Sequence, residues 1–146
     1  MTSTEPTVYE QVGGEPFFIN LTAAFYRGIA SDPVIRALYP EEDLGPAELR
    51  LRLFLEQYWG GPTTYHELRG HPRLRMRHFP FPIDTDMRNR WLTHMGVALA
   101  EQQLPQELED TMWRYFTMAA ISMENVPEGD PVERAFSQTV SNEEQQ

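Results

Sequence analysis

Among the metal-binding side chains of this sequence, the four histidines stand out because the chain has no cysteine. His66 and His71 fall in a turn-rich stretch and lack the helical spacing of a zinc pair, so we predict surface positions for both. His94 follows Trp91 by three residues and is expected on the surface of a helix or partly packed against it. His78 is the histidine whose surroundings suggest metal chemistry.

His78 closes a short segment, RLRMRH, in which Leu74 lies one helical turn earlier on the same face. The sequence Phe79-Pro80-Phe81-Pro82 then ends any helix. One imidazole on a short helix among apolar groups can present a single axial ligand to haem iron. A core histidine satisfied by hydrogen bonds has the same spacing and is the simpler interpretation of the pattern alone.

Basic residues gather around this histidine. Arg69, Arg73, Arg75 and Arg77 are four of the twelve basic residues of a chain whose formal net charge is −10. Guanidinium groups beside an iron ligand suit the carboxylates of haem propionates. A solvated basic face explains the cluster equally well.

Three polar aromatic residues form a further group: Tyr26, Tyr39 and Trp91. Such side chains are often core residues whose O–H or N–H bonds to the backbone. Their alternative role is to donate hydrogen bonds into one pocket, where they would stabilise negative charge on an iron-bound gas.

Composition excludes several classes of protein. The 146 residues suit one domain, and the acidic balance argues against nucleic acid or an anionic lipid surface as a partner. All twelve basic residues are arginine, which excludes Schiff-base chemistry and a P-loop lysine. The first residues, MTSTEPTVYE, resemble no targeting signal, and no stretch approaches the roughly 20 apolar residues of a membrane span, so a cytoplasmic protein is expected.

Prolines divide the chain into four long proline-free intervals, 17–32, 47–61, 83–104 and 106–126, each of which can hold one helix. The first has apolar residues at 18, 21, 25 and 29, the spacing of a buried helical stripe. A short helix is expected from Asp32-Pro33 to about Tyr39, and the third long helix is expected to be capped by Asp84 or Thr85. Residues 60–72 are expected to form an ordered loop.

The second long helix is expected to be amphipathic. One face carries Ala47, Leu51, Phe54, Leu55 and Tyr58, and the other carries Glu48, Arg52 and Glu56. With no convincing alternation of period two, the pattern predicts an all-α domain of four main helices.

The residues then show a resemblance to a known family. The motifs LYPEEDL, LFLEQYWGGP and GHPRLRMRH, the PF that follows, and the pairs Gly13-Gly14 and Gly60-Gly61 resemble those of truncated haemoglobins, specifically group II, the O class common in actinobacteria. The resemblance covers about residues 8–127. It implies a truncated globin fold, a two-over-two helical sandwich around haem b. Outside the globin domain we expect a flexible N-terminus at 1–7 and, from its polar and acidic composition, a disordered tail at 128–146.

The resemblance also implies roles for individual residues. His78 would bind the iron through Nε2 while its other ring nitrogen donates to a backbone carbonyl or similar group. Tyr26, Tyr39 and Trp91 would be the distal hydrogen-bond donors, and Ala47 stands where many globins carry a distal histidine. The remaining contacts with the cofactor are assigned to Leu51, Phe54, Leu55, Leu74, Arg75, Arg77, Phe81 and Met95.

The use of the haem is left open by the sequence. The first expectation is reversible binding of dioxygen and of other diatomic gases, carbon monoxide and nitric oxide. The alternatives are nitric oxide dioxygenation or peroxidase-type chemistry with an external reductase, and a gas or redox sensor. A homodimer is compatible with the sequence, as is a monomer.

Overall fold

The fold is described here from a computed structural model, which covers residues 5–78 and 80–126, with the side chain of Arg75 also outside the description. Every regular element in these ranges is a helix. The helices are α1 (Val8–Gln11), α2 (Glu15–Ala30), α3 (Pro33–Arg36), α4 (Gly45–Tyr58), α5 (Thr64–Arg69), α6 (Leu74–His78), α7 (Thr85–Glu101) and α8 (Gln106–Met123). The expected tail at 128–146 lies outside the described residues, and the division of the chain into segments stays a prediction.

Local signals explain where the predicted helices begin. Asp32 caps α3 by accepting a hydrogen bond from the Val34 amide at 3.2 Å, and Pro33 occupies the first turn. Asp84 caps α7 by accepting from the Met87 amide at 2.8 Å. Both caps were predicted from the sequence, and both are confirmed.

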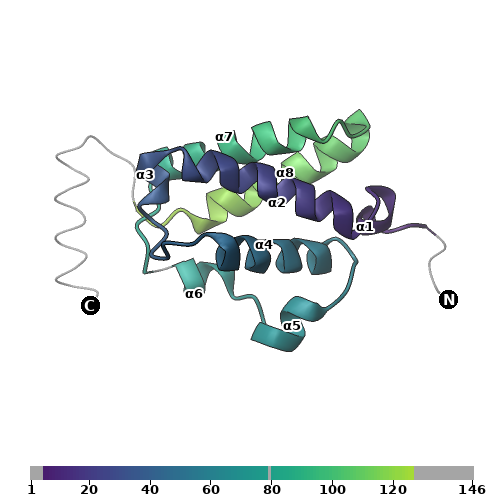
Figure 1. The fold of residues 1–146 in the computed structure, drawn as a ribbon, viewed down its shortest axis with the longest axis horizontal. Coiled ribbons are helices and arrows are strands. Elements are labelled where there is room, and N and C mark those ends of the chain that lie inside the picture. Colours follow the sequence, from purple (N-terminus) through teal and green to yellow (C-terminus); the bar gives the residue numbers. More distant parts are fainter. Residues whose placement is uncertain (1–4, 79, 127–146) are drawn as a thin grey trace.

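Two helical layers make up the domain. Helix α2 packs against α4 and α7, and α7 packs against α8. Figure 1 shows α2 and α4 running in opposite directions, as α7 and α8 also do. The short helix α6, which carries His78 at its end, contacts α8. This is the expected two-over-two arrangement of helices.

The core forms along the stripe predicted in α2. Phe18, Leu21, Phe25 and Ile29 are fully buried, and they join buried residues of α4, α7 and α8 in one cluster. Burying apolar surface is the main source of stability here, at roughly 25 cal/mol per Å² removed from water. The core therefore fixes α2 against the other three long helices, and with it the position of Tyr26.

Two helices were not predicted. Helix α1 begins with a capping box, in which the Glu10 amide donates to Thr7 Oγ1 at 3.1 Å and the Thr7 amide donates to Glu10 Oε1 at 2.8 Å. Helix α5 corrects the expectation of a loop over 60–72. Contacts with other parts of the chain stabilise α5, because the His66 amide donates to Gln57 Oε1 of α4 at 2.8 Å and the Tyr65 side chain is buried.

The amphipathic prediction for α4 needs two corrections. Tyr58 was placed on the buried face but is 50% exposed, because it stacks on Tyr115 at the surface with ring centroids 4.0 Å apart. Glu56 was placed on the polar face but is buried. Its carboxylate pairs with Arg52 at 3.0 Å, and Arg52 also reaches Glu15 of α2 at 3.3 Å, so the neighbouring helix covers this side of α4.

Glycines at the end of α4 allow α1 to approach closely. Gly60 has φ +99°, and a Cβ there would lie 2.6 Å from Cβ of Thr7. A Cβ on Gly61 would lie 2.5 Å from the ring of Tyr9, whose amide donates to the Trp59 carbonyl at 2.9 Å. Any larger residue at either position would push the N-terminal helix away.

None of the helices in the described ranges is long and apolar enough to cross a membrane.

Candidate haem site

The imidazole of His78 is held in one orientation. Its Nδ1 lies 2.7 Å from the carbonyl oxygen of Leu74, one turn earlier in α6. Since a carbonyl can only accept a hydrogen bond, Nδ1 carries the proton, and the neutral ring has its lone pair on Nε2. Within the described part of the chain, Nε2 makes no hydrogen bond. This is the arrangement that a metal-binding histidine requires.

Arg77, next to His78, has an unsatisfied buried donor. Its Nη2 donates to the carbonyl of Arg69 at 3.0 Å, but its Nε is buried and has no hydrogen-bond partner. A buried N–H without a partner costs about 1–3 kcal/mol. An anionic group brought in with a cofactor would satisfy it, so the donor set beside His78 fits a haem propionate. Arg75, the other predicted propionate partner, has its side chain outside the described residues.

The structure brings together Tyr26 of α2, Tyr39 and Ala47 of α4. Tyr39 lies beyond α3, because this helix ends at Arg36 and not near Tyr39 as expected. The rings of Tyr26 and Tyr39 meet edge to face with centroids 5.8 Å apart. The hydroxyl of Tyr26 donates to the Ala47 carbonyl at 3.4 Å, a long distance for an O–H donor. A bond this weak leaves the phenol free to turn toward a better acceptor.

Burial keeps both phenols protonated. It raises the pKa of Tyr26 above its ordinary value, and the nearby hydroxyl of Tyr39 raises it further. Burial also raises the pKa of Tyr39, although the hydrogen bond with Tyr26 partly offsets the effect. Both side chains therefore remain hydrogen-bond donors at neutral pH.

Trp91 joins this group through a shared neighbour. Its ring contacts Phe25 at 5.2 Å between centroids, and Phe25 contacts Tyr26 at 5.0 Å. On its other side Trp91 contacts Phe116 of α8 at 6.0 Å. The indole N–H donates to no described group, so, like Nε2 of His78, it is a free polar atom of a partly buried side chain.

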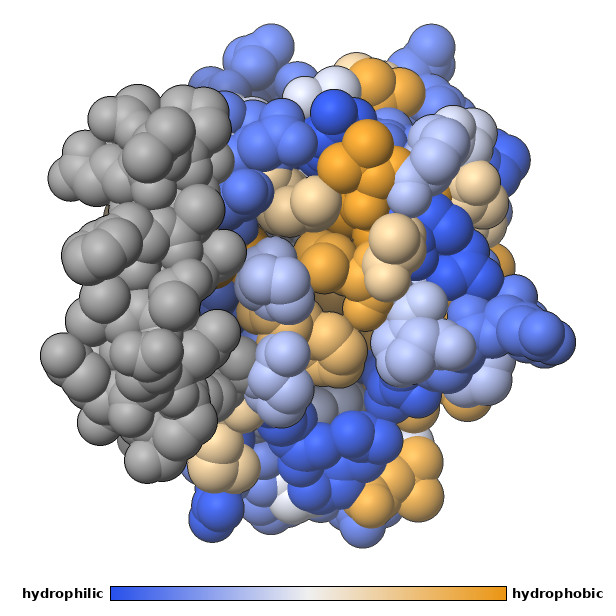
Figure 2. Space-filling model, turned by 90° about the vertical axis from the view of Figure 1, so that its left-hand side faces the viewer, coloured by the Kyte–Doolittle hydropathy of each residue, from blue (hydrophilic) through white to orange (hydrophobic). Residues whose placement is uncertain are grey.

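The remaining predicted contact residues are apolar and lie in or against the core. Ala47, Phe54, Leu55 and Met95 are buried, and Leu51 and Leu74 pack against them while partly exposed. Phe81 is half-buried and lies just beyond α6. Figure 2 shows apolar side chains around a recess on the end of the molecule where α3 and α6 lie. Their contacts with a haem stay predictions.

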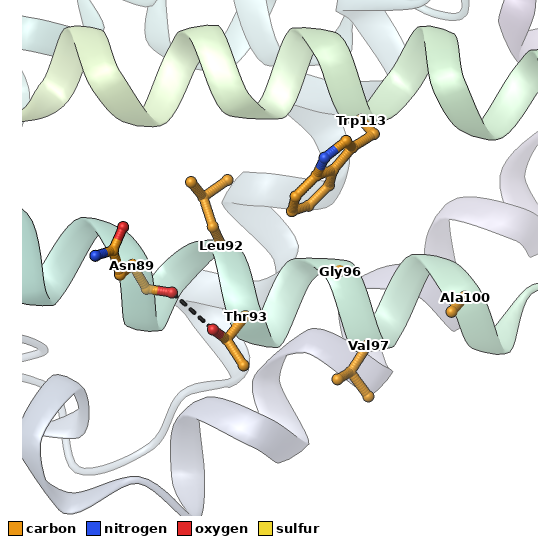
Figure 3. Close-up of a pocket in the computed structure, with 7 residues that line it drawn as sticks. All are labelled: Asn89, Leu92, Thr93, Gly96, Val97, Ala100 and Trp113. Carbon is orange, nitrogen blue, oxygen red and sulfur yellow. Dashed lines mark hydrogen bonds between the residues drawn. The ribbon is translucent and has the colours of Figure 1, made fainter.

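A second hollow in the described part of the chain lies away from His78 and from the aromatic group. A depression of about 530 Å³ on α7 and α8 is lined by uncharged residues, including Leu92, Val97 and Trp113, and by none of the predicted site residues (Figure 3). No group of three or more acidic or histidine side chains able to hold a metal occurs among the described residues. His66 and His71 are exposed, as predicted, and His94 is partly packed.

Sequence reasoning missed one residue of this region, Asn125. Its Nδ2 donates to the carbonyl of Phe81 at 2.8 Å and reaches the carbonyl of His78 at 3.4 Å. No local pattern could have indicated it, because its partners are more than 40 residues earlier in the chain.

A two-on-two helical fold, one oriented histidine and a separate pair of phenols, Tyr26 buried and Tyr39 partly buried, fit a globin. Residues 7–125 match the bacterial-like globin family, and the chain belongs to that family, in its group of group II truncated haemoglobins.

Relatives support the same conclusion. The group 2 truncated hemoglobin YjbI of Bacillus subtilis is 35% identical over 122 residues, which span 84% of this chain and 91% of the relative. The crystal structure of a thermostable hemoglobin from the actinobacterium Thermobifida fusca is 62% identical, with a TM-score of 0.83, covering 84% of this chain and all of that one. A group II 2-on-2 hemoglobin of Agrobacterium tumefaciens is 35% identical, with a TM-score of 0.80, covering 86% and 98%. Membership of the globin family implies haem binding.

Proposed function

We propose that this globin binds haem b through Nε2 of His78 and uses it to bind dioxygen reversibly. The 2.7 Å hydrogen bond from Nδ1 of His78 to the Leu74 carbonyl carries the proposal, because it leaves Nε2 as the free, unprotonated nitrogen. A donor at Nδ1 also makes the ring a stronger ligand. The haem would supply a ferrous iron that takes a diatomic gas, with carbon monoxide and nitric oxide as further ligands.

The aromatic group beside Ala47 would hold the bound gas. Tyr26, Tyr39 and Trp91 donate hydrogen bonds toward it, and the small side chain of Ala47 leaves room beside them. Both phenols stay protonated, and each hydrogen bond of this kind contributes about 0.5–1.5 kcal/mol. A pocket with three donors favours retention of dioxygen over rapid release.

Arg77 would bind a propionate of the cofactor. Its unsatisfied Nε and its charge suit a propionate, and the bond from Nη2 to the Arg69 carbonyl already fixes the guanidinium. Tight haem binding therefore depends on α6 as a unit, with the iron ligand and the propionate partner on adjacent residues.

Absorption spectra of the purified protein test the proposal. We expect a strong Soret band that shifts on reduction and again on addition of dioxygen or carbon monoxide. Replacing His78 by Gly should remove the axial bond, and free imidazole should restore the spectrum. An unchanged spectrum in the His78→Gly variant would exclude this histidine as the ligand, and a colourless protein after addition of haemin would end the proposal.

A second candidate function is peroxidase-type catalysis, and a chain of aromatic contacts favours it. Trp91 contacts Phe116 at 6.0 Å, Phe116 contacts Tyr115 at 5.7 Å, and Tyr115 stacks on the exposed Tyr58 at 4.0 Å. Such a series of rings can carry single electrons between the pocket and the surface. In the net reaction one hydrogen peroxide becomes two waters while two phenol donors each lose one electron and one proton. Turnover of a phenol no faster than with free haemin would exclude this function.

A further inference from the structure

The clearest unexplained feature near the site is a strap formed by residues 124–126, directly after α8. Asn125 accepts a hydrogen bond from the Ile83 amide through Oδ1 at 2.8 Å, and its own amide donates to the Ile83 carbonyl at 2.8 Å. Its Nδ2 donates to the carbonyls of Phe81 and His78, at 2.8 and 3.4 Å. Asn125 thus bonds to His78 at the end of α6 and to Phe81 and Ile83 in the connection between α6 and α7.

Residues 80–83 cannot form all of their backbone hydrogen bonds among themselves. Pro80 and Pro82 have no N–H to donate, and residues 80–84 form no helix. The only hydrogen bond within the described part of the segment that involves His78 runs from the Phe81 amide to the His78 carbonyl at 2.9 Å. Because backbone groups need partners, Nδ2 of Asn125 supplies a donor where the two prolines have none, and Oδ1 supplies an acceptor for the Ile83 amide.

The neighbours of Asn125 anchor the strap to other elements. Glu124 accepts from Arg88 of α7 at 2.8 Å and from Thr85 at 3.0 Å. Val126 is buried, and its amide also donates to the Ile83 carbonyl, at 3.1 Å. Because Glu124 and Val126 are themselves held in place, the backbone and side chain of Asn125 bind the α6–α7 connection from a well-fixed position.

From this geometry we infer that Asn125 is a positioning residue for His78. The imidazole is fixed within α6 by Leu74. Asn125 ties the end of α6 to the strap through a short hydrogen bond to the Phe81 carbonyl at 2.8 Å and a longer one to the His78 carbonyl at 3.4 Å. Together these contacts would hold the imidazole of His78 in position for a bound haem. The inference rests on the proposed function, because it assigns Asn125 a part in the bond between His78 and the haem iron.

The test compares three variants of the haem-loaded protein. Asn125→Ala removes every side-chain bond, whereas Asn125→Asp keeps the shape and the acceptor for Ile83 but loses the donor to His78 and Phe81. Glu124→Ala is the matched control, since it weakens the same strap at Arg88 and Thr85 without touching the segment 78–83.

The main readout is the iron–histidine stretching band of the reduced protein, measured by resonance Raman spectroscopy. We expect the band to shift in Asn125→Ala and Asn125→Asp and to stay in place in Glu124→Ala. Transfer of haem to an excess of apomyoglobin should accelerate on the order of tenfold in the two Asn125 variants, the effect of losing one or two ordinary hydrogen bonds. If Asn125→Ala does not fold, the isosteric Asp variant still decides the question.

Two results would overturn the inference: an unshifted band in the Asn125 variants, or an equal shift in Glu124→Ala. Either result leaves the proposed function intact, because it requires a haem bound through His78. Failure of the proposed function is recognised separately, by the lack of any haem spectrum or iron–histidine band in the unmodified protein.

Discussion

Trp91 and Trp113 lie on neighbouring helices and have different surroundings. The Trp91 ring packs between Phe25 and Phe116, in the group that contains Tyr26. The Trp113 ring lies against Gly96 on the outer face of α7 and α8, where it is 37% exposed. The first indole is a candidate for contact with a bound gas, and the second is an internal control with the same chemistry.

Replacing Trp91 by Phe should accelerate dioxygen release. The change removes one donor worth about 0.5–1.5 kcal/mol, which corresponds to about two- to twelvefold in rate if the whole effect appears in escape. Stopped-flow displacement of dioxygen by carbon monoxide measures this rate. Trp113→Phe should leave it unchanged, and equal rates in the unmodified protein and Trp91→Phe would assign Trp91 to packing.

Asp32 makes the stability depend on pH. Its carboxylate lies 2.8 Å from Nε2 of His94 and 3.0 Å from Nη1 of Arg90. The hydrogen bond from His94, and then those from Arg90, lower the pKa of Asp32 below its ordinary value. A carboxyl with a depressed folded pKa stabilises the protein above the unfolded pKa, near 3.9, and this stabilisation is lost as the pH falls through the folded value.

Asp32→Asn should therefore be less stable than the unmodified protein at pH 7, and the difference should shrink below about pH 4. Asparagine keeps the helix cap, so the charge is the property that changes. Urea unfolding at pH 7, 5 and 3 measures the difference. Asp43→Asn is the control, because Asp43 accepts from the Gly45 amide at 2.8 Å and forms no ion pair with the described residues. A difference independent of pH would contradict this account.

At the scale of elements, α2 and α7 meet through Gly28. A Cβ on Gly28 would lie 2.5 Å from Nδ1 of His94, closer than side chains tolerate. The same His94 is held by Asp32 at 2.8 Å, so it cannot turn aside without breaking that contact. The glycine is what allows these two helices to pack closely.

Gly28→Ala should lower the free energy of unfolding by about 1–2 kcal/mol. Overpacking costs about 1–3 kcal/mol, and the gain of alanine over glycine in a helix, about 0.5–1 kcal/mol, offsets only part of it. Urea denaturation measures the change. In a His94→Ala background the same substitution should be neutral or stabilising, whereas a stabilising effect in the unmodified protein would show that the helices can separate at no cost.

Local signals were enough to predict most helices. The stripe of α2 and the caps at Asp32 and Asp84 depend on residues close in sequence, and all three appear in the structure. Helix α5 could not be predicted in this way, because its stability comes from the contact with Gln57 and the burial of Tyr65. The burial of Glu56 likewise depends on a neighbouring helix, α2, whose Glu15 also pairs with Arg52. The capping box of Thr7 and Glu10 was a readable signal for α1 that the sequence analysis did not use.

In the candidate site, too, features that depend on nearby residues could be predicted, and features that depend on distant contacts could not. Spacing predicted that Leu74 lies one turn before His78, and the family resemblance implied that the ring donates to a backbone carbonyl or similar group. In the structure that acceptor is the Leu74 carbonyl. Tyr26, Tyr39 and Trp91 were grouped by residue type as possible donors into one pocket, and the family resemblance implied their distal role. Spacing alone could not have brought three separate segments together. Asn125 was missed for the same physical reason, since only the folded chain places it beside His78.

At the scale of the whole molecule, haem should contribute to stability. A ligand that binds only the folded state stabilises it by about 2.7 kcal/mol at a hundredfold excess over its Kd. For a domain of this size we expect Tm to fall by roughly 10 °C when haem is extracted and to recover when haemin is added back. Thermal melts followed by circular dichroism test this. Identical melting temperatures with and without haem would mean that the fold does not depend on the cofactor.

The contact between Asn125 and the α6–α7 segment also orders events during synthesis. Asn125 follows His78 by 47 residues and Ile83 by 42. At the usual 5–20 residues per second, His78 leaves the ribosome roughly 2 to 10 seconds before Asn125. During that interval the carboxamide of Asn125 is not available to hold the segment that follows α6. Stable capture of haem should therefore follow translation of the whole globin unit, and a nascent chain stopped before Asn125 should lose its haem readily.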